Sequence, residues 1–188
     1  MEISPEIRSF YEALPKNHML AIFFREHELI LEIMEKMRSA NSLLQKMKKK
    51  EDAEDIIDSL LISSERLLDT ESHLSREEVL YEEMIARKIV GPPRVMMMEH
   101  DMLLRNKNLF YNTIQQYNEI DWDEFKARVN DLYLTLYYKL WDHLQKENEE
   151  IFPKAFDLIK EDTKWHEMTV ACDEIGYSLF MSVSQKDQ

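Results

Sequence analysis

The sequence predicts an all-α fold, an up-down-up-down four-helix bundle with short N-terminal and C-terminal accessory helices. Composition supports this prediction, because the 188 residues include only two glycines and five prolines, which interrupt helices. Periodicity also supports it, because four long segments carry apolar residues at steps of three and four. The apolar content of 44% fills one core, so we expect a single domain over residues 1–188, with the bundle at about 17–153.

The chain is expected to begin with a short helix from Pro5, with Ser4 as its cap, to about Pro15. The first long helix follows from about Asn17, its expected N-cap. Its inner face carries Leu20, Phe24, His27, Leu31, Met34 and Met37. Because His27 belongs to this apolar series, we expect its side chain to face inward.

The second long helix is expected over residues 52–87, with His73 and Glu77 near its inner face. Its apolar series is less regular than that of the other helices, because Ser63 and Thr70 interrupt it.

The third long helix follows a turn at Gly91-Pro92-Pro93, the strongest helix breaker in the chain. Its inner face carries Met96, His100, Leu103, Phe110, Ile114 and Tyr117. Lys107 falls in the same series, and we expect its side chain to snorkel or to rotate away from the core.

The fourth long helix is expected to start at Asp121, a favourable N-cap. Its apolar series runs through Val129, Leu132, Leu136 and Leu140 and continues into His143 and Glu147. Pro153 should end or bend the helix. A C-terminal helix at about 162–180 should pack across the outside of the bundle, with Trp165, Met168, Cys172, Ile175 and Leu179 on one face.

Charge and cysteine content restrict the partners and the location. The net charge of −13 argues against nucleic acid, because phosphates need clusters of Lys and Arg. The single cysteine, Cys172, rules out an internal disulfide and fits a reducing compartment. No apolar stretch approaches the roughly 20 residues that span a bilayer, and no signal peptide is evident at the N-terminus. We therefore expect a soluble, cytoplasmic protein.

Six polar residues on the inner faces form a candidate metal site. Two of the histidines are each followed four residues later by a glutamate, so each pair shares one helix face. Antiparallel packing at about 1.5 Å per residue places His27 level with His73, and His100 within about one turn of His143. The turn between the second and third helices leaves an overhang of roughly 9 Å. The predicted ligands are His27, His73, Glu77, His100, His143 and Glu147.

The donor atoms of this set indicate the metal. Imidazole nitrogen with carboxylate oxygen, and without thiolate, favours iron, manganese or zinc. Four histidines and two glutamates that can bridge are enough for two metals with an open coordination position. A small diatomic molecule or a peroxide would bind at that position.

These motifs resemble the hemerythrin (HHE cation-binding) family over about residues 17–153. The resembling segments are Arg25-Glu26-His27-Glu28-Leu29, His73 with Glu77, Glu99-His100-Asp101, and His143 with Glu147. The resemblance implies a four-helix bundle with a non-haem centre of two iron ions. Two further segments, Gly91–Met96 and Asp173–Tyr177, resemble the prokaryotic subgroup whose hemerythrin-like domains precede PAS sensor domains, although no PAS domain follows in this sequence.

The sequence departs from the oxygen-carrying members of the family, which have two histidines one turn apart on the third helix. Here Leu104 follows His100 at that spacing and Met96 precedes it. The departure disfavours reversible oxygen carriage and favours sensing. Several ligand alternatives stay open: Glu78 competes with Glu77, and His18 and Glu26 compete with His27.

The function expected from the sequence is that of a di-iron protein that binds or senses O2, peroxide, nitric oxide or iron, with manganese or zinc as alternative metals. A signalling partner protein would then receive the output. Two other hypotheses stay open. One is a di-iron enzyme that consumes peroxide or nitric oxide, and the other is a metal-free helical interaction module.

Overall fold

The computed structural model describes residues 3–177, and every regular element in that range is a helix. The α-helices are α1 (Pro5–Glu12), α2 (Met19–Leu44), α3 (Glu54–Leu68), α4 (Glu71–Ala86), α5 (Gly91–Gln115), α6 (Trp122–Lys146), α7 (Phe152–Leu158) and α8 (Asp162–Ile175). A short 3-10 turn (Lys50–Asp52) and a π-helical turn (Glu147–Ile151) complete the set.

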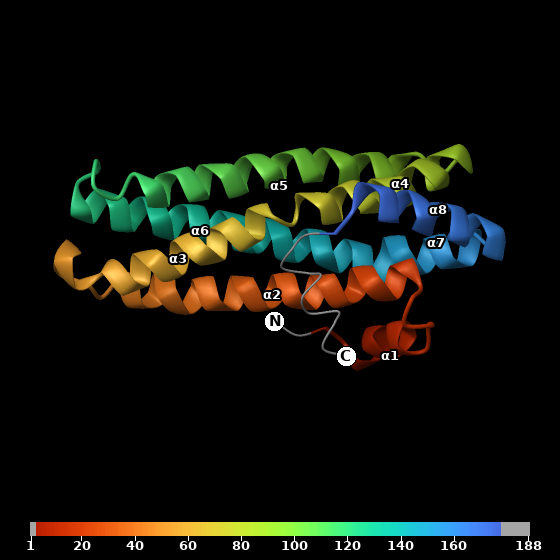
Figure 1. Ribbon diagram of the computed structural model, residues 1–188, viewed down its shortest axis with the longest axis horizontal. Helices are drawn as coiled ribbons and strands as arrows, with labels where there is room; N and C mark the ends of the chain where they lie inside the picture. The colour runs from red at the N-terminus through yellow and green to blue at the C-terminus, as the bar shows by residue number, and fades with distance from the viewer. Residues whose placement is uncertain (1–2, 178–188) are drawn as a thin grey trace.

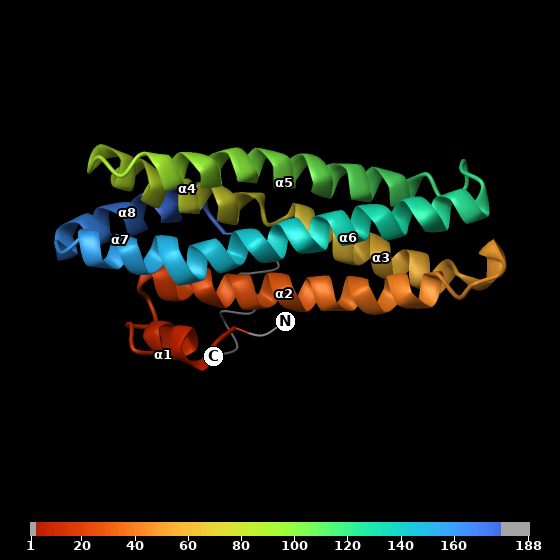
Figure 2. The ribbon, with the colours of Figure 1, turned by 180° about the vertical axis from the view of Figure 1, so that it is seen from behind.

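Four long rods form the bundle, with α3 and α4 together making the second rod (Figure 1). Rods that follow one another in the chain pack against each other, and α2 also contacts α6, which closes the bundle. Figure 2 shows the same order from behind, with α1 against α2 and with α7 and α8 at one end. The predicted fold class, a helical bundle with accessory helices at both termini, is confirmed.

The second rod is broken in the middle, where a continuous helix over residues 52–87 was expected. α3 ends at Leu68 and α4 begins at Glu71. Between them the Thr70 hydroxyl donates a hydrogen bond of 2.7 Å to the Leu67 carbonyl. A threonine side chain that bonds to the backbone in this way competes with regular helix. The break is visible between α3 and α4 in Figure 1.

Side-chain caps fix the starts of several helices. Ser4 caps α1 and Asp121 caps α6, as predicted. The prediction for α2 is wrong, because His18, and not Asn17, is the N-cap, and its Nδ1 accepts a hydrogen bond of 3.2 Å from the Leu20 amide. His18 is therefore used at a helix terminus.

The fourth rod does not end at Pro153. α6 passes into the π-helical turn, and Pro153 lies in the first turn of α7. Proline has no N–H to donate, and the carbonyl of Asn148, five residues earlier, accepts a hydrogen bond of 2.8 Å from the Tyr11 hydroxyl. A π turn contains more residues than an α turn. Here the consecutive residues Glu147 and Asn148 are both buried.

Two apolar clusters fill the bundle. The larger one joins α2, α3, α5 and α6 at the end farther from α1, and includes Ile33, Leu60 and Phe110. The smaller one lies beneath α1, α7 and α8 and includes Phe24 and Tyr81. Along each rod the predicted ligands fall at the boundary between these clusters, so the candidate site is enclosed by core at both ends.

α8 is shorter than predicted. It ends at Ile175, followed by Gly176 at φ 87°, a backbone conformation that favours glycine. Positions 178–180, including the predicted core residue Leu179, lie outside the described range. Within residues 3–177, no helix combines the length and the apolar character needed to cross a bilayer.

Candidate metal centre

The structure brings all six predicted ligands together in the buried interior. α2 contributes His27, α4 contributes His73 and Glu77, α5 contributes His100, α6 contributes His143, and the π-helical turn contributes Glu147. They form two groups that share Glu77. The first group is His27, His73 and Glu77, and the second is Glu77, His100, His143 and Glu147, with the candidate donor atoms of each group within 4.8 Å of one another.

The Glu77 carboxylate spans the two groups. Its Oε1 lies 2.9 Å from His27 Nε2 and 3.1 Å from His73 Nε2. Its Oε2 lies 3.4 Å from His100 Nε2. Each oxygen atom thus faces a different group, the geometry of a carboxylate that bridges two metal ions.

The Glu147 carboxylate spans the groups in the same manner. Its Oε1 lies 3.1 Å from His143 Nε2 and 3.6 Å from His100 Nε2. Its Oε2 lies 3.4 Å from His27 Nε2. Each of the two positions is therefore surrounded by two imidazole nitrogens and by oxygens from the two carboxylates.

Several of these inward-facing atoms have no hydrogen-bond partner. They are Nε2 of His73, His100 and His143, and Oε2 of Glu77 and Glu147, all fully buried. Buried polar atoms without a partner are rare because each one costs free energy. Five such atoms directed at two adjacent positions fit a site built for metal ions.

The Nδ1 atoms of the first group bond outward. His27 Nδ1 lies 2.9 Å from the Asn148 side-chain oxygen, and His73 Nδ1 lies 2.7 Å from Glu26 Oε2. An Nδ1–H that donates to such an oxygen leaves Nε2 as the acceptor atom that can bind a metal.

The second group repeats this arrangement. His100 Nδ1 lies 3.0 Å from Glu78 Oε1, and His143 Nδ1 lies 2.9 Å from Glu99 Oε2. All four histidines therefore have an oxygen partner on the outer nitrogen, as metal-binding histidines do in proteins.

The spacing of the inner atoms also fits metal ions. Ligands that bond to one ion at about 2.1 Å and at right angles lie about 3.0 Å apart. The distances from the Nε2 atoms to the Glu77 oxygens, 2.9 to 3.4 Å, agree with this value. The residues present therefore fit two metal ions with nitrogen and oxygen ligands, the donor set of iron, manganese and zinc.

Charge pairing controls the protonation of the centre before metal binds. Burial lowers the pKa of His73, but the carboxylates of Glu77 and Glu26 outweigh it and raise this pKa to about 9. Burial likewise lowers the pKa of His100, whereas Glu147, Glu77 and Glu78 raise it to about 11. A metal ion must displace these protons to bind.

Tyr81 is a site residue that the sequence analysis missed. Its buried hydroxyl donates a hydrogen bond to Glu147 Oε1, and its ring centroid lies 5.6 Å from that of His100. Burial and the neighbouring carboxylates keep the pKa of this phenol well above its ordinary value. Its position four residues after Glu77, on the same helix face, was the available signal.

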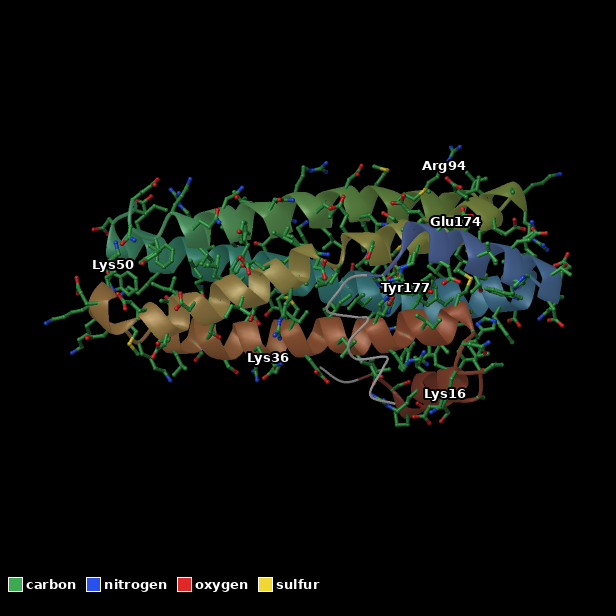
Figure 3. The ribbon with its side chains drawn as sticks, in the orientation of Figure 1. Lys16, Lys36, Lys50, Arg94, Glu174 and Tyr177 are labelled. Carbon is green, nitrogen blue, oxygen red and sulfur yellow. The ribbon has the colours of Figure 1, made fainter. Side chains whose placement is uncertain are left out.

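Arg76 is a second residue that the sequence analysis missed. The side chain is fully buried, and its Nη2 donates to both oxygens of Glu26, at 2.8 and 2.9 Å. The guanidinium carbon lies 4.2 Å from the ring centroid of Tyr177, which is labelled just beyond the end of α8 in Figure 3. Arg76 thus holds Glu26 in place, and Glu26 in turn orients His73.

The structure also places the residues that the sequence left open as alternative ligands. Glu26 and Glu78 bond to outer nitrogens, while neither they nor the capping residue His18 belong to the two groups formed by the described residues. His166 is exposed. Met96 and Leu104 flank His100 in the third rod, and the Tyr81 ring lies beside this histidine from α4.

Comparison with known proteins agrees with this geometry. The family model described as the hemerythrin HHE cation binding domain matches residues 18–155, a range that contains all six predicted ligands. No curated protein matches the chain. The family match covers most of the sequence, and the chain belongs to the hemerythrin HHE cation-binding domain family.

Proposed function

We propose that this protein binds two iron ions at the shared His and Glu groups and uses them to sense a small oxidising ligand, namely O2, peroxide or nitric oxide. The observation that carries the proposal is the set of buried, unpartnered Nε2 and carboxylate oxygen atoms directed at two adjacent positions. His27, His73, His100 and His143 would be terminal ligands, and Glu77 and Glu147 would bridge.

Four protein atoms around each position leave room for an exogenous ligand, because iron commonly accepts more than four ligands. Bound iron would supply a redox-active Lewis acid for that ligand. Manganese and zinc suit the same nitrogen and oxygen donors and are the alternative metals.

The chain itself controls the surroundings of the centre. The Phe152 ring lies 5.6 Å from the His27 ring, and the Phe23 ring lies 5.7 Å from the His73 ring. These apolar side chains exclude water from the first group. On the second group, the Tyr81 hydroxyl holds one oxygen of Glu147 through its hydrogen bond.

A sensing role is favoured over oxygen carriage for two reasons. The third rod supplies one histidine, His100, so among residues 3–177 no further histidine joins the second group. The contacts from His73 through Glu26 and Arg76 to Tyr177 connect the centre to the end of α8. A signalling partner that contacts the C-terminal region would complete such a sensor.

The test is metal analysis of the full chain after anaerobic loading with ferrous iron. We expect two iron ions per chain and a near-ultraviolet charge-transfer absorption band after exposure to air. Glu77→Gln should lose both ions because it removes the shared bridge, whereas the exposed, matched control Glu71→Gln should retain them. Less than about a tenth of an equivalent of iron in the wild-type protein would contradict the proposal and favour a metal-free module.

A further inference from the structure

Lys107 is a buried cation that the six-ligand arrangement leaves without a role. It lies on α5 in the same inner series as His100 and Leu103, and only 2% of its surface is exposed. The expectation that it would snorkel or rotate away from the core was therefore wrong. Its ammonium group donates a hydrogen bond of 2.7 Å to the Thr70 hydroxyl oxygen.

The ammonium group has no carboxylate partner among the residues that the structure describes. No ion pair links it to an acidic side chain within 4.0 Å, and Thr70 is its one hydrogen-bond partner in residues 3–177. An ammonium can donate three hydrogen bonds. A buried, unpaired cation is costly, and burial lowers the pKa of Lys107 to about 8.

The position of Lys107 relates it to the metal centre. Side chains on a helix lean toward its N-terminus, and for Lys107 that direction leads toward His100. Its hydrogen-bond partner, Thr70, lies three residues before His73 on the second rod. Three carboxylates act on the ammonium through charge, namely Glu77, Glu71 and Glu147. Two of them, Glu77 and Glu147, span the ligand groups.

Lys107 and Tyr81 thus lie toward opposite ends of the centre. Tyr81 follows Glu77 on α4, whereas Lys107 meets the second rod at Thr70, where α3 and α4 are interrupted. The Thr70 hydroxyl donates its own proton to the Leu67 carbonyl, so it serves the ammonium only as an acceptor. A neutral hydroxyl oxygen does not balance the charge, and an anion nearby would.

We propose that Lys107 is a specificity-determining residue of the metal centre, whose positive charge favours a small anion, such as hydroperoxide or azide, over a neutral diatomic molecule. This inference rests on the proposed function and narrows its ligand class. At an effective dielectric constant of about 20, opposite unit charges separated by several ångströms correspond to roughly a tenfold to thirtyfold gain in affinity. A neutral ligand gains little from the same charge.

The experiment compares the iron-loaded full chain with two variants at Lys107. Azide is the anionic probe and nitric oxide the neutral one, and each is titrated spectroscopically. Lys107→Met removes the charge and keeps the length of the side chain, so azide affinity should fall about tenfold while nitric oxide affinity changes less than about twofold. Lys107→Arg should keep the azide affinity, because arginine stays protonated.

Lys126→Met is the matched control, because it removes a positive charge at the start of α6, beside the larger apolar cluster and away from the centre. Its azide affinity should equal that of the wild type. Lys107→Met should also fold, since replacing an unpaired buried charge by an apolar side chain is often neutral or stabilising. Urea unfolding checks this point independently of ligand binding.

The outcomes separate the two proposals. A wild-type protein that holds no iron contradicts the proposed function. An iron-loaded wild type that binds nitric oxide but not azide contradicts the inference about Lys107 alone. So does an iron-loaded Lys107→Met variant with an unchanged ratio of azide to nitric oxide affinity, because that result leaves Lys107 only a structural bond to Thr70.

Discussion

The two ligand groups of the centre have the same inner chemistry but different surroundings. In the first group, the Glu26 side chain that supports His73 is only 2% exposed and is paired with the buried Arg76. In the second group, the Glu78 side chain that supports His100 is 38% exposed. Glu99, which supports His143, pairs with Lys146, a residue at the surface of α6.

This difference separates a fixed side of the centre from an accessible one. Charge interactions are strong where water is excluded and weak where it is not. The first group is therefore held by the protein interior, whereas the second is the side where protons and ligands reach the centre most directly. The three predictions below test this division.

The largest effect is expected from removing the cations that support the two groups. Arg76→Met leaves Glu26 as a buried carboxylate without its guanidinium, which should lower the free energy of unfolding of the metal-free protein by about 4 kcal/mol. Lys146→Met breaks a surface pair with Glu99 and should cost less than about 1 kcal/mol. Urea denaturation measures both, and equal losses would remove the distinction between the groups.

A somewhat smaller effect is expected from the titration of His73. The pKa of His73 in the folded protein, about 9, lies above its ordinary value of 6.5. Its charged form therefore stabilises the metal-free protein fully below pH 6.5, and this stabilisation, on the order of 3 kcal/mol, is lost as the pH rises to about 9. The pKa of His100, about 11, extends the loss to higher pH.

Unfolding free energies measured from pH 6 to 11 show which histidine causes each part of the loss of stability. His73→Gln should reduce the slope of stability against pH between about 6.5 and 9. His100→Gln should reduce it from about 6.5 to 11, so only this variant changes the slope above pH 9. Iron affinity should change in the opposite direction and rise with pH, because iron competes with the same protons. A metal-free protein whose stability is constant over this range would contradict the imidazolium–carboxylate pairing.

The smallest effect is expected from the outer carboxylates. Glu26→Gln keeps the shape of the side chain that supports His73 but removes its charge, so iron affinity should fall about tenfold to hundredfold. Glu78→Gln removes the half-exposed partner of His100 and should lower the affinity less than about threefold. Competition with a chelator measures both constants. Equal losses would show that water does not weaken the second group.

The six predicted ligands could be found from the sequence because each is a polar residue in the apolar series of its own helix. That pattern depends on the spacing within one helix and not on how the helices pack. The predicted overhang between the second and third rods is also explained. Glu77 lies nine residues before the end of α4, and His100 lies nine residues after the start of α5, so these two are level. The predicted overhang compared the height of His100 with that of His73, which lies one turn before Glu77 on α4.

The outer partners were not predictable from periodicity, because they depend on which side chains meet between helices. Glu26 directly precedes His27, yet it supports His73 on another rod. Arg76 directly precedes Glu77, and its charge made a surface position the ordinary expectation. Its burial follows from its pairing with Glu26 and from the covering helix α8, contacts that only the folded chain creates.

The π-helical turn changes the direction in which the side chains after it point. Because of its extra residue, the side chains after it are rotated by about 100° relative to a continuous α-helix. Deleting Glu149 would restore the α-helical repeat and change the direction of Phe152 and of the side chains after it. The same widened turn that admits both Glu147 and Asn148 to the interior thus sets the orientation in which α7 leads the chain toward α8.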